Sequence, residues 1–159
     1  MTLGMAWLGR CCAWAYLAVA LCLSGCASTP QASSERDAEA KQFATHPNAA
    51  TIYVYRTEVR SDPEDSVLYV DNRLIGATVP GTYFQINVPP GTHLLHGLGR
   101  DQGKLQLNAR SGELYFVSLS PENGNSHFEL IRPETAKREL QQCCALLENW
   151  APRQRPLLR

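Results

Sequence analysis

Short runs of apolar and β-branched residues, separated by turn residues, fill the centre of this 159-residue chain. Within the runs apolar and polar positions alternate, as they do in half-buried strands. The pattern predicts strands near 50–58, 66–71, 73–79, 82–88, 92–99, 103–110, 113–120 and 126–132. A packed sandwich is the simplest way to bury so many one-sided strands. We therefore expect a mainly β fold, an antiparallel β-sandwich.

Turn residues occupy the gaps between these runs. Asp71-Asn72 is typical of a tight hairpin. Val79-Pro80-Gly81-Thr82 and Pro89-Pro90-Gly91-Thr92 both place proline and glycine at the central positions of a type II turn. Arg110-Ser111-Gly112-Glu113 and Asn123-Gly124 predict two more reversals.

A helical period follows the last predicted strand. Pro133 suits the first position of a helix, and the segment from Glu134 to Leu147 aligns Ala136, Leu140, Cys143 and Leu147 on one stripe. We expect a C-terminal helix docked on the sandwich, which places the domain at residues 49–150. Residues 151–159 form a basic tail with three arginines, which we expect to be unstructured.

The N-terminus has the anatomy of a secretory signal peptide. A weakly positive start, Met1 to Arg10, precedes an apolar run from Cys11 to Leu23. That run is shorter than the roughly 20 apolar residues of a membrane-spanning helix, which argues against a permanent anchor helix. Residues 1–25 are therefore predicted to be a signal peptide, and the cysteine that follows them, Cys26, indicates a lipoprotein signal peptide.

Leu23-Ser24-Gly25-Cys26 resembles the bacterial lipobox. The resemblance implies that Cys26 is the lipidation residue: diacylglycerol on its thiol, cleavage before it, and acylation of the new amine. Several acyl chains make such attachment lasting. Because Ala27 follows instead of aspartate, the expected location is the bacterial cell envelope, on the inner leaflet of the outer membrane facing the periplasm.

Residues 26–48 are expected to be the lipidated cysteine and a tether. This stretch is rich in Ala, Ser, Glu and Gln, a composition that forms no core of its own. Ser34 and Asp37 suggest a weak capping box for a short helix from Glu35 to Phe43, with Phe43 docked on the domain. As a flexible coil the segment would hold the domain about 25 Å from the lipid.

Four segments of the domain occur in the order of a known family. They are Tyr53-Val54-Tyr55-Arg56, Tyr69-Val70-Asp71-Asn72-Arg73-Leu74-Ile75-Gly76, Gly81-Thr82-Tyr83-Phe84 and Val88-Pro89-Pro90-Gly91-Thr92-His93. The chain resembles a bacterial lipoprotein domain-of-unknown-function family with YVYR and PPGTH signatures, and its hairpin is similar to PEGA-type modules. The resemblance implies a prealbumin-like sandwich on a lipid anchor and brings no known activity with it.

The charge of the chain limits the classes of partner that we expect. Fifteen basic and fifteen acidic side chains balance, so nucleic-acid binding is not expected.

Removal of the signal peptide leaves Cys26, Cys143 and Cys144. Adjacent Cα atoms lie about 3.8 Å apart, below the usual disulfide range of about 4.4–6.8 Å, so we expect no internal disulfide. On the predicted helix Cys143 belongs to the buried stripe and Cys144 to its flank.

Candidate chemistry is sparse in this sequence. His93 and His96 are three residues apart on a predicted strand, which puts them on opposite faces, while His46 and His127 lie in other segments. The acidic loop from Glu58 to Asp65 lacks the spacing of a calcium loop, and no nucleophile elbow occurs. We therefore expect no metal, no cofactor and no catalytic residue.

Arg56 admits two interpretations. It shares a strand face with Ile52 and Val54, so it could be the buried partner of a carboxylate. The favoured alternative is a strand-end arginine that lays its stem on apolar surface and keeps its head in water.

These observations predict a non-enzymatic, lipid-anchored interaction or structural module of the periplasm, attached to the membrane through Cys26, with an envelope protein as partner. The alternative is a ligand-binding or inhibitory lipoprotein that captures a small molecule, peptide or glycan at the sandwich loops, which a concave aromatic pocket would favour. An envelope hydrolase is a third class and would need converging titratable groups.

Overall fold

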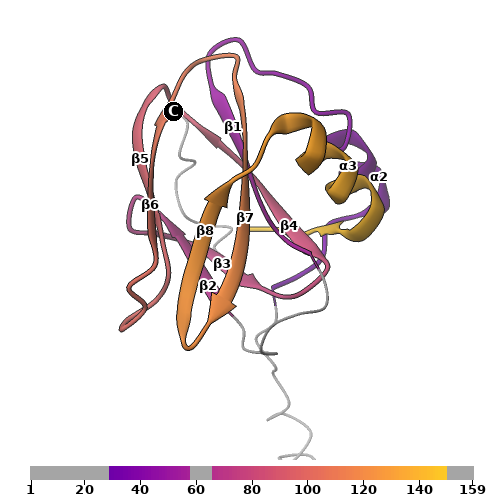
Figure 1. Cartoon of the computed structure of the whole chain (residues 1–159). Helices are drawn as coiled ribbons and strands as arrows, with labels where there is room; N and C mark the ends of the chain where they lie inside the picture. The colour runs from indigo at the N-terminus through magenta and orange to yellow at the C-terminus, as the bar shows by residue number, and fades with distance from the viewer. Residues whose placement is uncertain (1–28, 58–65, 150–159) are drawn as a thin grey trace, which may run out of the picture.

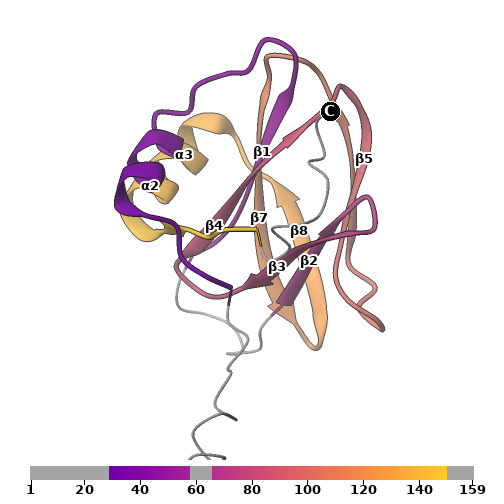
Figure 2. The same cartoon turned by 180° about the vertical axis from the view of Figure 1, so that it is seen from behind.

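Two β-sheets packed face to face form the body of the molecule, and helices α2 and α3 lie side by side on the outer face of one of them (Figures 1 and 2). The computed structural model describes residues 29–57 and 66–149. Its elements, in chain order, are α2 (Ser34–Ala40), β1 (Ala50–Arg56), β2 (Ser66–Val70), β3 (Arg73–Thr78), β4 (Thr82–Val88), β5 (Gly91–His96), β6 (Lys104–Ala109), β7 (Leu114–Glu122), β8 (Asn125–Leu130), α3 (Pro133–Cys143) and β9 (Ala145–Leu146). The predicted mainly β sandwich with a C-terminal helix is confirmed.

The strand order is β8-β7-β1-β4-β9 in one sheet and β3-β2-β5-β6 in the other. Neighbours pair antiparallel except that β1 is parallel to β7 and β4 is parallel to β9. The first sheet is therefore mixed, whereas the sequence led us to expect antiparallel pairing throughout. Tight turns determine only the pairing of strands adjacent in the chain, and the neighbours of β1 come from distant segments.

Each face of β1 contributes to a different core, because all seven of its residues are buried. Ile52 and Val54 point between the sheets into the sandwich core. Tyr53 and Tyr55 point outward into a second core beneath the helices, together with Ala40, Phe43, Tyr83, Phe116, Ala136, Leu140, Cys144 and Leu146. The helices thus cover a sheet face that would otherwise expose large aromatic side chains.

Helix α3 begins as expected, with Pro133 in its first turn and Ala136 and Leu140 buried against the sheet. It ends earlier than predicted, at Cys143, and residue 144 is extended with φ −121° and ψ 143°. The next residues form β9, where Ala145 N–H donates to Gly81 O at 2.9 Å and Leu147 N–H to Tyr83 O at 2.8 Å. The free edge of β4 supplies hydrogen-bond partners for the backbone of these residues. If the helix continued, these bonds to β4 would not form.

The N-terminal segment differs from the expected tether. Its described part, residues 29–48, lies against the domain. Helix α2 is capped by Ser33, whose Oγ accepts from Arg36 N–H at 3.3 Å, one residue before the expected cap. Docking of Phe43 is confirmed, because its ring meets those of Tyr53 and Phe116 edge-on at 5.3 and 5.8 Å.

Two of the turns have the backbone geometry that the sequence predicts. Asp71 and Asn72 have φ of 51° and 60°, the left-handed pair that a type I′ hairpin requires. Gly81 has φ 73°, as expected for a type II turn. Gly91, with φ 144°, departs from the type II geometry and already begins β5.

Candidate functional site

The residue expected to carry lipid, Cys26, lies outside the described residues, as do the predicted signal peptide 1–25 and the basic tail 151–159. The described chain begins three residues later, at Thr29. Across residues 29–57 and 66–149, no helix combines the length and the apolar character needed to cross a bilayer. The position of Thr29 on the domain is therefore the structural feature nearest to the candidate anchor.

Thr29 is fastened to β3 through its side chain. Its Oγ1 donates to Ala77 O at 2.8 Å and accepts from Ala77 N–H at 2.9 Å. Since β3 is an edge strand, the hydroxyl takes the place of a neighbouring strand. Gly76 leaves room for this contact, because a Cβ there would lie 2.8 Å from the Phe84 ring and 3.2 Å from the Thr29 methyl.

The next residues bind β9, the edge of the other sheet. Ala32 N–H donates to Leu146 O and Glu148 N–H donates to Pro30 O, both at 2.8 Å. Gln31 forms an antiparallel bridge with Leu147. Residues 29–43, which we call the N-terminal clasp, therefore join the edges of both sheets and continue through α2 to the buried Phe43.

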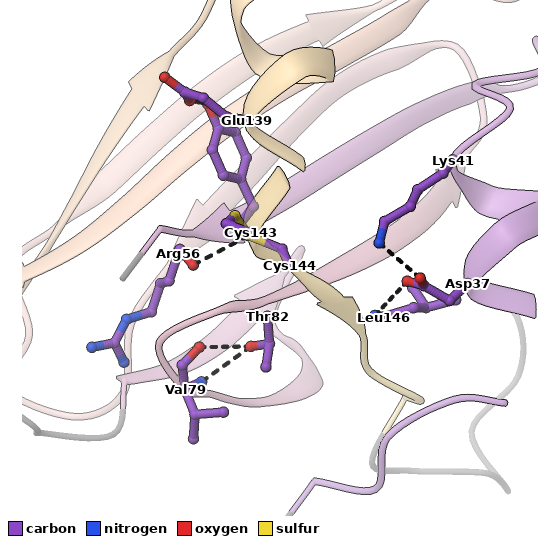
Figure 3. The surroundings of a disulfide bond; sticks show 10 residues. Asp37, Lys41, Arg56, Val79, Thr82, Glu139, Cys143, Cys144 and Leu146 are labelled. Atoms are coloured by element: carbon purple, nitrogen blue, oxygen red, sulfur yellow. Dashed lines mark hydrogen bonds and ion pairs between the residues drawn. A yellow bond between two sulfur atoms is a disulfide. The ribbon is translucent and has the colours of Figure 1, made fainter. Parts of the chain in front are cut away.

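Asp37, a clasp residue in α2, connects this helix to β9 (Figure 3). Its carboxylate accepts from Leu146 N–H at 2.8 Å and from Lys41 Nζ at 2.7 Å. Burial alone would raise the pKa of Asp37, but the hydrogen bonds from Lys41, Tyr83 and the Leu146 amide together lower it below its ordinary value. Arg36 adds an ion pair with Glu148.

A disulfide joins Cys143 and Cys144 at the end of α3 (Figure 3), which corrects the expectation of no internal disulfide. Cys144 is 5% exposed with Sγ 3.6 Å from Arg56 O, whereas Cys143 is only half-buried. The expected order of burial was therefore reversed. Because Cys144 is extended while Cys143 ends the helix, the helical rotation of about 100° per residue does not relate the two side chains.

The sequence did not indicate that three tyrosines of the outer core anchor the helices to the sheet. Tyr53 OH donates to Ala40 O at 2.9 Å and Tyr55 OH donates to Glu139 Oε2 at 2.6 Å. Burial raises the pKa of Tyr53 to about 12 and also raises the pKa of Tyr55 and of Tyr83. Protonated at neutral pH, the hydroxyls act as donors that hold both helices on the sheet.

Arg56 is buried, with 3% of its surface exposed, and its Nη1 donates to Thr78 O at 2.9 Å. The favoured interpretation, a guanidinium in water, is therefore wrong. Arg56 follows Ile52 and Val54 on the same face of β1, and its bond to Thr78 O connects it to the end of β3. The acidic loop named in the sequence lies outside the described residues.

The β2–β3 hairpin and the Pro-Pro-Gly-Thr-His segment meet through Asp71 and His93. His93 Nδ1 lies 2.6 Å from Asp71 Oδ2 and its Nε2 lies 2.8 Å from Pro89 O. Asp71 Oδ1 also accepts from Leu94 N–H at 2.9 Å. These contacts tie the β2–β3 hairpin to the proline-rich turn, so Asp71 and His93 both have a folding role.

The remaining histidines lie apart from that pair. His96 stacks on Tyr69 with ring centroids 5.1 Å apart, on the strand face opposite His93, as alternation predicts. His46 and His127 are exposed in other segments. Among the described residues, no three His, Cys, Asp or Glu side chains come together as a metal site would need.

A polar cluster at one end of the sandwich escaped the sequence analysis. Asp101 accepts from the backbone N–H groups of Gly103 and Ser126, both at 2.8 Å, and from the Ser126 hydroxyl. The hydroxyls of Ser126 and Ser66 lie 2.6 Å apart. Beside the cluster is a hollow of about 220 Å³ that Leu98 also lines. The carboxylate fixes loop 97–103 to the β7–β8 turn.

A second hollow, of about 260 Å³, lies where the clasp passes over the outer face of β1 and β4. Its described lining is mainly polar, with Glu39, His46, Gln85 and Asn87 among its members and no Phe, Tyr or Trp. Thr51 Oγ1 donates to Asn87 Oδ1 at 2.8 Å within it. The concave aromatic pocket that would indicate ligand capture is not found among the described lining of either hollow.

Similarity to known proteins is limited. An uncharacterized protein of Haemophilus influenzae is 28% identical over 130 residues, which cover 78% of this chain and 77% of that protein. No family model matches the chain, and no solved structure matches it.

Proposed function

We propose that this chain is a lipid-anchored interaction or structural module of the bacterial envelope, held on the inner leaflet of the outer membrane through Cys26 and facing the periplasm. One observation carries the proposal. The lipobox-like Leu23-Ser24-Gly25-Cys26 stands three residues before Thr29, the first described residue, which is already bound to the domain. A processed chain would begin at the lipid and enter a folded module almost at once.

A binding rather than catalytic role is supported by the contacts of three half-buried carboxylates. Asp37, Asp71 and Asp101 each accept from at least one backbone N–H, those of Leu146, Leu94 and Ser126 respectively. These carboxylates are occupied in holding segments of the fold together. We propose that the module recognises an envelope protein and catalyses no reaction.

The ligand-binding alternative has less support. The hollow at the loop end, about 220 Å³, is smaller than the roughly 300–1,000 Å³ of ordinary ligand pockets, and aromatic groups are missing from its described lining. An interaction surface suits this geometry better than an enclosed site.

The anchor is tested by metabolic labelling with an alkyne analogue of palmitate. The wild-type chain should be labelled, and Cys26→Ala should lose the label and accumulate as uncleaved precursor. Cys22→Ala is the matched control, because Cys22 lies in the predicted signal peptide and its loss should leave labelling intact. Equal label on wild type and Cys26→Ala would refute the anchor. Crosslinking in intact cells with mass spectrometry would then identify the protein partner.

A further inference from the structure

The distance between the candidate anchor and the domain is set by the clasp. Thr29 is three positions after Cys26. An extended chain spans at most about 3.6 Å per residue, so the lipid attachment lies within roughly 11 Å of the domain. A free 22-residue tether would have allowed about 25 Å. This step rests on the proposed lipidation of Cys26.

Thr29 lies near one end of the sandwich, which we call the anchor end. In both views the described chain begins at the lower end of the molecule, where the β5–β6 loop and the β7–β8 turn also lie (Figures 1 and 2). Hydrogen bonds connect the parts of this end. Thr78 at the end of β3 donates to Ser66 O at 2.9 Å, and Ser66 contacts Ser126 beside the β7–β8 turn.

Apolar side chains are exposed on the loops of the anchor end. The large hydrophobic residues that are exposed in the described chain are Val79, Leu98 and Leu130, at 37%, 55% and 49%. Val79 lies in the β3–β4 turn and Leu98 in loop 97–103, both at the anchor end. Leu130 ends β8, the strand that runs away from that end. Exposed apolar loop residues next to a lipid attachment are suited to the membrane interface.

Both loops are held in shape before any membrane contact. The Thr82 hydroxyl donates to Val79 O at 2.6 Å (Figure 3). Asp101 fixes loop 97–103 through its bonds to Gly103 and Ser126. Little ordering entropy is therefore lost when these loops meet a surface.

We propose that the domain rests with its anchor end on the phospholipid surface, so that Leu98 and Val79 lie in the headgroup region. The opposite end, which carries the Asp71–His93 pair, then faces the periplasm and is free for a protein partner. The occupant of the anchor end is the membrane to which Cys26 is attached.

A photocrosslinking amino acid placed at position 98, 79 or 130 of the full-length chain tests this orientation in Gram-negative cells. Leu130 is the matched control, because its exposure is close to that of Leu98. After irradiation, mass spectrometry should find phospholipid adducts at positions 98 and 79 at least ten-fold more often than at position 130.

Two outcomes would overturn the proposal: equal lipid adducts at positions 98 and 130, or protein adducts in place of lipid at position 98. Palmitate-analogue labelling of the same samples separates this test from that of the anchor. Labelled protein without preferential lipid adducts refutes the orientation alone. Unlabelled protein refutes the proposed function on which the orientation rests.

Discussion

Asp71 and His93 are 22 positions apart in the chain, yet their side chains share one short contact that joins a hairpin to a proline-rich turn. Each partner also binds backbone, through Leu94 N–H and Pro89 O. His93 is buried, so a lost partner would leave a polar group with few replacements in water. At the residue scale, this pair gives the hairpin and the proline-rich turn a structural reason to carry these two residues.

Removal of the Asp71 carboxylate should destabilise the fold. We expect Asp71→Ala to lower the free energy of unfolding by about 2 kcal/mol, because it removes a charged hydrogen bond and a bond to Leu94 N–H. Asp71→Asn, which keeps an acceptor, should cost about half as much. Urea denaturation measures both, with exposed Glu122→Ala as the control. A loss below about 0.5 kcal/mol for Asp71→Ala would contradict this role.

The two cysteines of the disulfide should react with an alkylating agent at different rates once the bond is reduced. Before reduction, the folded chain should show no thiol from Cys143 or Cys144. After mild reduction, alkylation should modify half-buried Cys143 well before Cys144, which is 5% exposed. Peptide mass spectrometry over a time course distinguishes the two sites, and labelling in denaturant supplies the control of equal access. Faster modification of Cys144 in the folded chain would contradict the described burial.

At the scale of elements, the sequence predicts what local patterns determine. Alternation and turn residues place the eight strands from β1 to β8, because both signals act between near neighbours in the chain. Strand β9 and the pairing of residues 29–32 with the sheet edges escaped prediction, since they exist only where the edges of β4 and β3 lack another partner. Ala32 and Thr29 bear no local sign that Leu146 and Ala77 will bind them. Helix α3 ends at Cys143, earlier than predicted, for the same reason: the residues after it pair with the edge of β4.

The contact between α2 and β9 should depend on pH through Asp37. Its pKa is lowered in the folded chain from the usual 3.8, so the folded state holds its proton less tightly than the unfolded state. Its contribution to stability is therefore present above about pH 4 and is lost as the pH falls through the folded pKa.

The variant Asp37→Asn tests this dependence. At pH 7 it should be less stable than wild type by about 1 kcal/mol, because the Lys41 ion pair is lost while an acceptor for Leu146 N–H remains. The difference should shrink as the pH is lowered from 5 to 3 in urea denaturation series. Exposed Glu113→Gln serves as the control. A difference that stays constant over this range would show that the charge of Asp37 is immaterial.

At the scale of the whole molecule, two hydrophobic cores lie on either side of one sheet, so both faces of its central strand β1 are buried. The lipidation of Cys26 can be predicted from the four lipobox-like residues Leu23-Ser24-Gly25-Cys26, because the resemblance lies in a short local segment. It could not predict the orientation of the domain, since that depends on where Thr29 docks. The segment predicted to be a tether, 26–48, has a polar composition, but contacts of a few side chains, Phe43 and Asp37 above all, hold its described part against the domain.

Lengthening the connection should release the domain from the membrane. A 15-residue Gly-Ser linker inserted between Ala27 and Ser28 adds a flexible reach of about 20 Å and leaves the lipobox and the clasp intact. We expect lipid adducts at position 98 to fall several-fold, because the anchor then no longer confines Leu98 to the interface, while palmitate labelling is unchanged. The same linker inserted after Asn149 is the control and should leave the adducts as they are. Undiminished adducts in the first variant would mean that the short connection between Cys26 and Thr29 does not place the domain on the membrane.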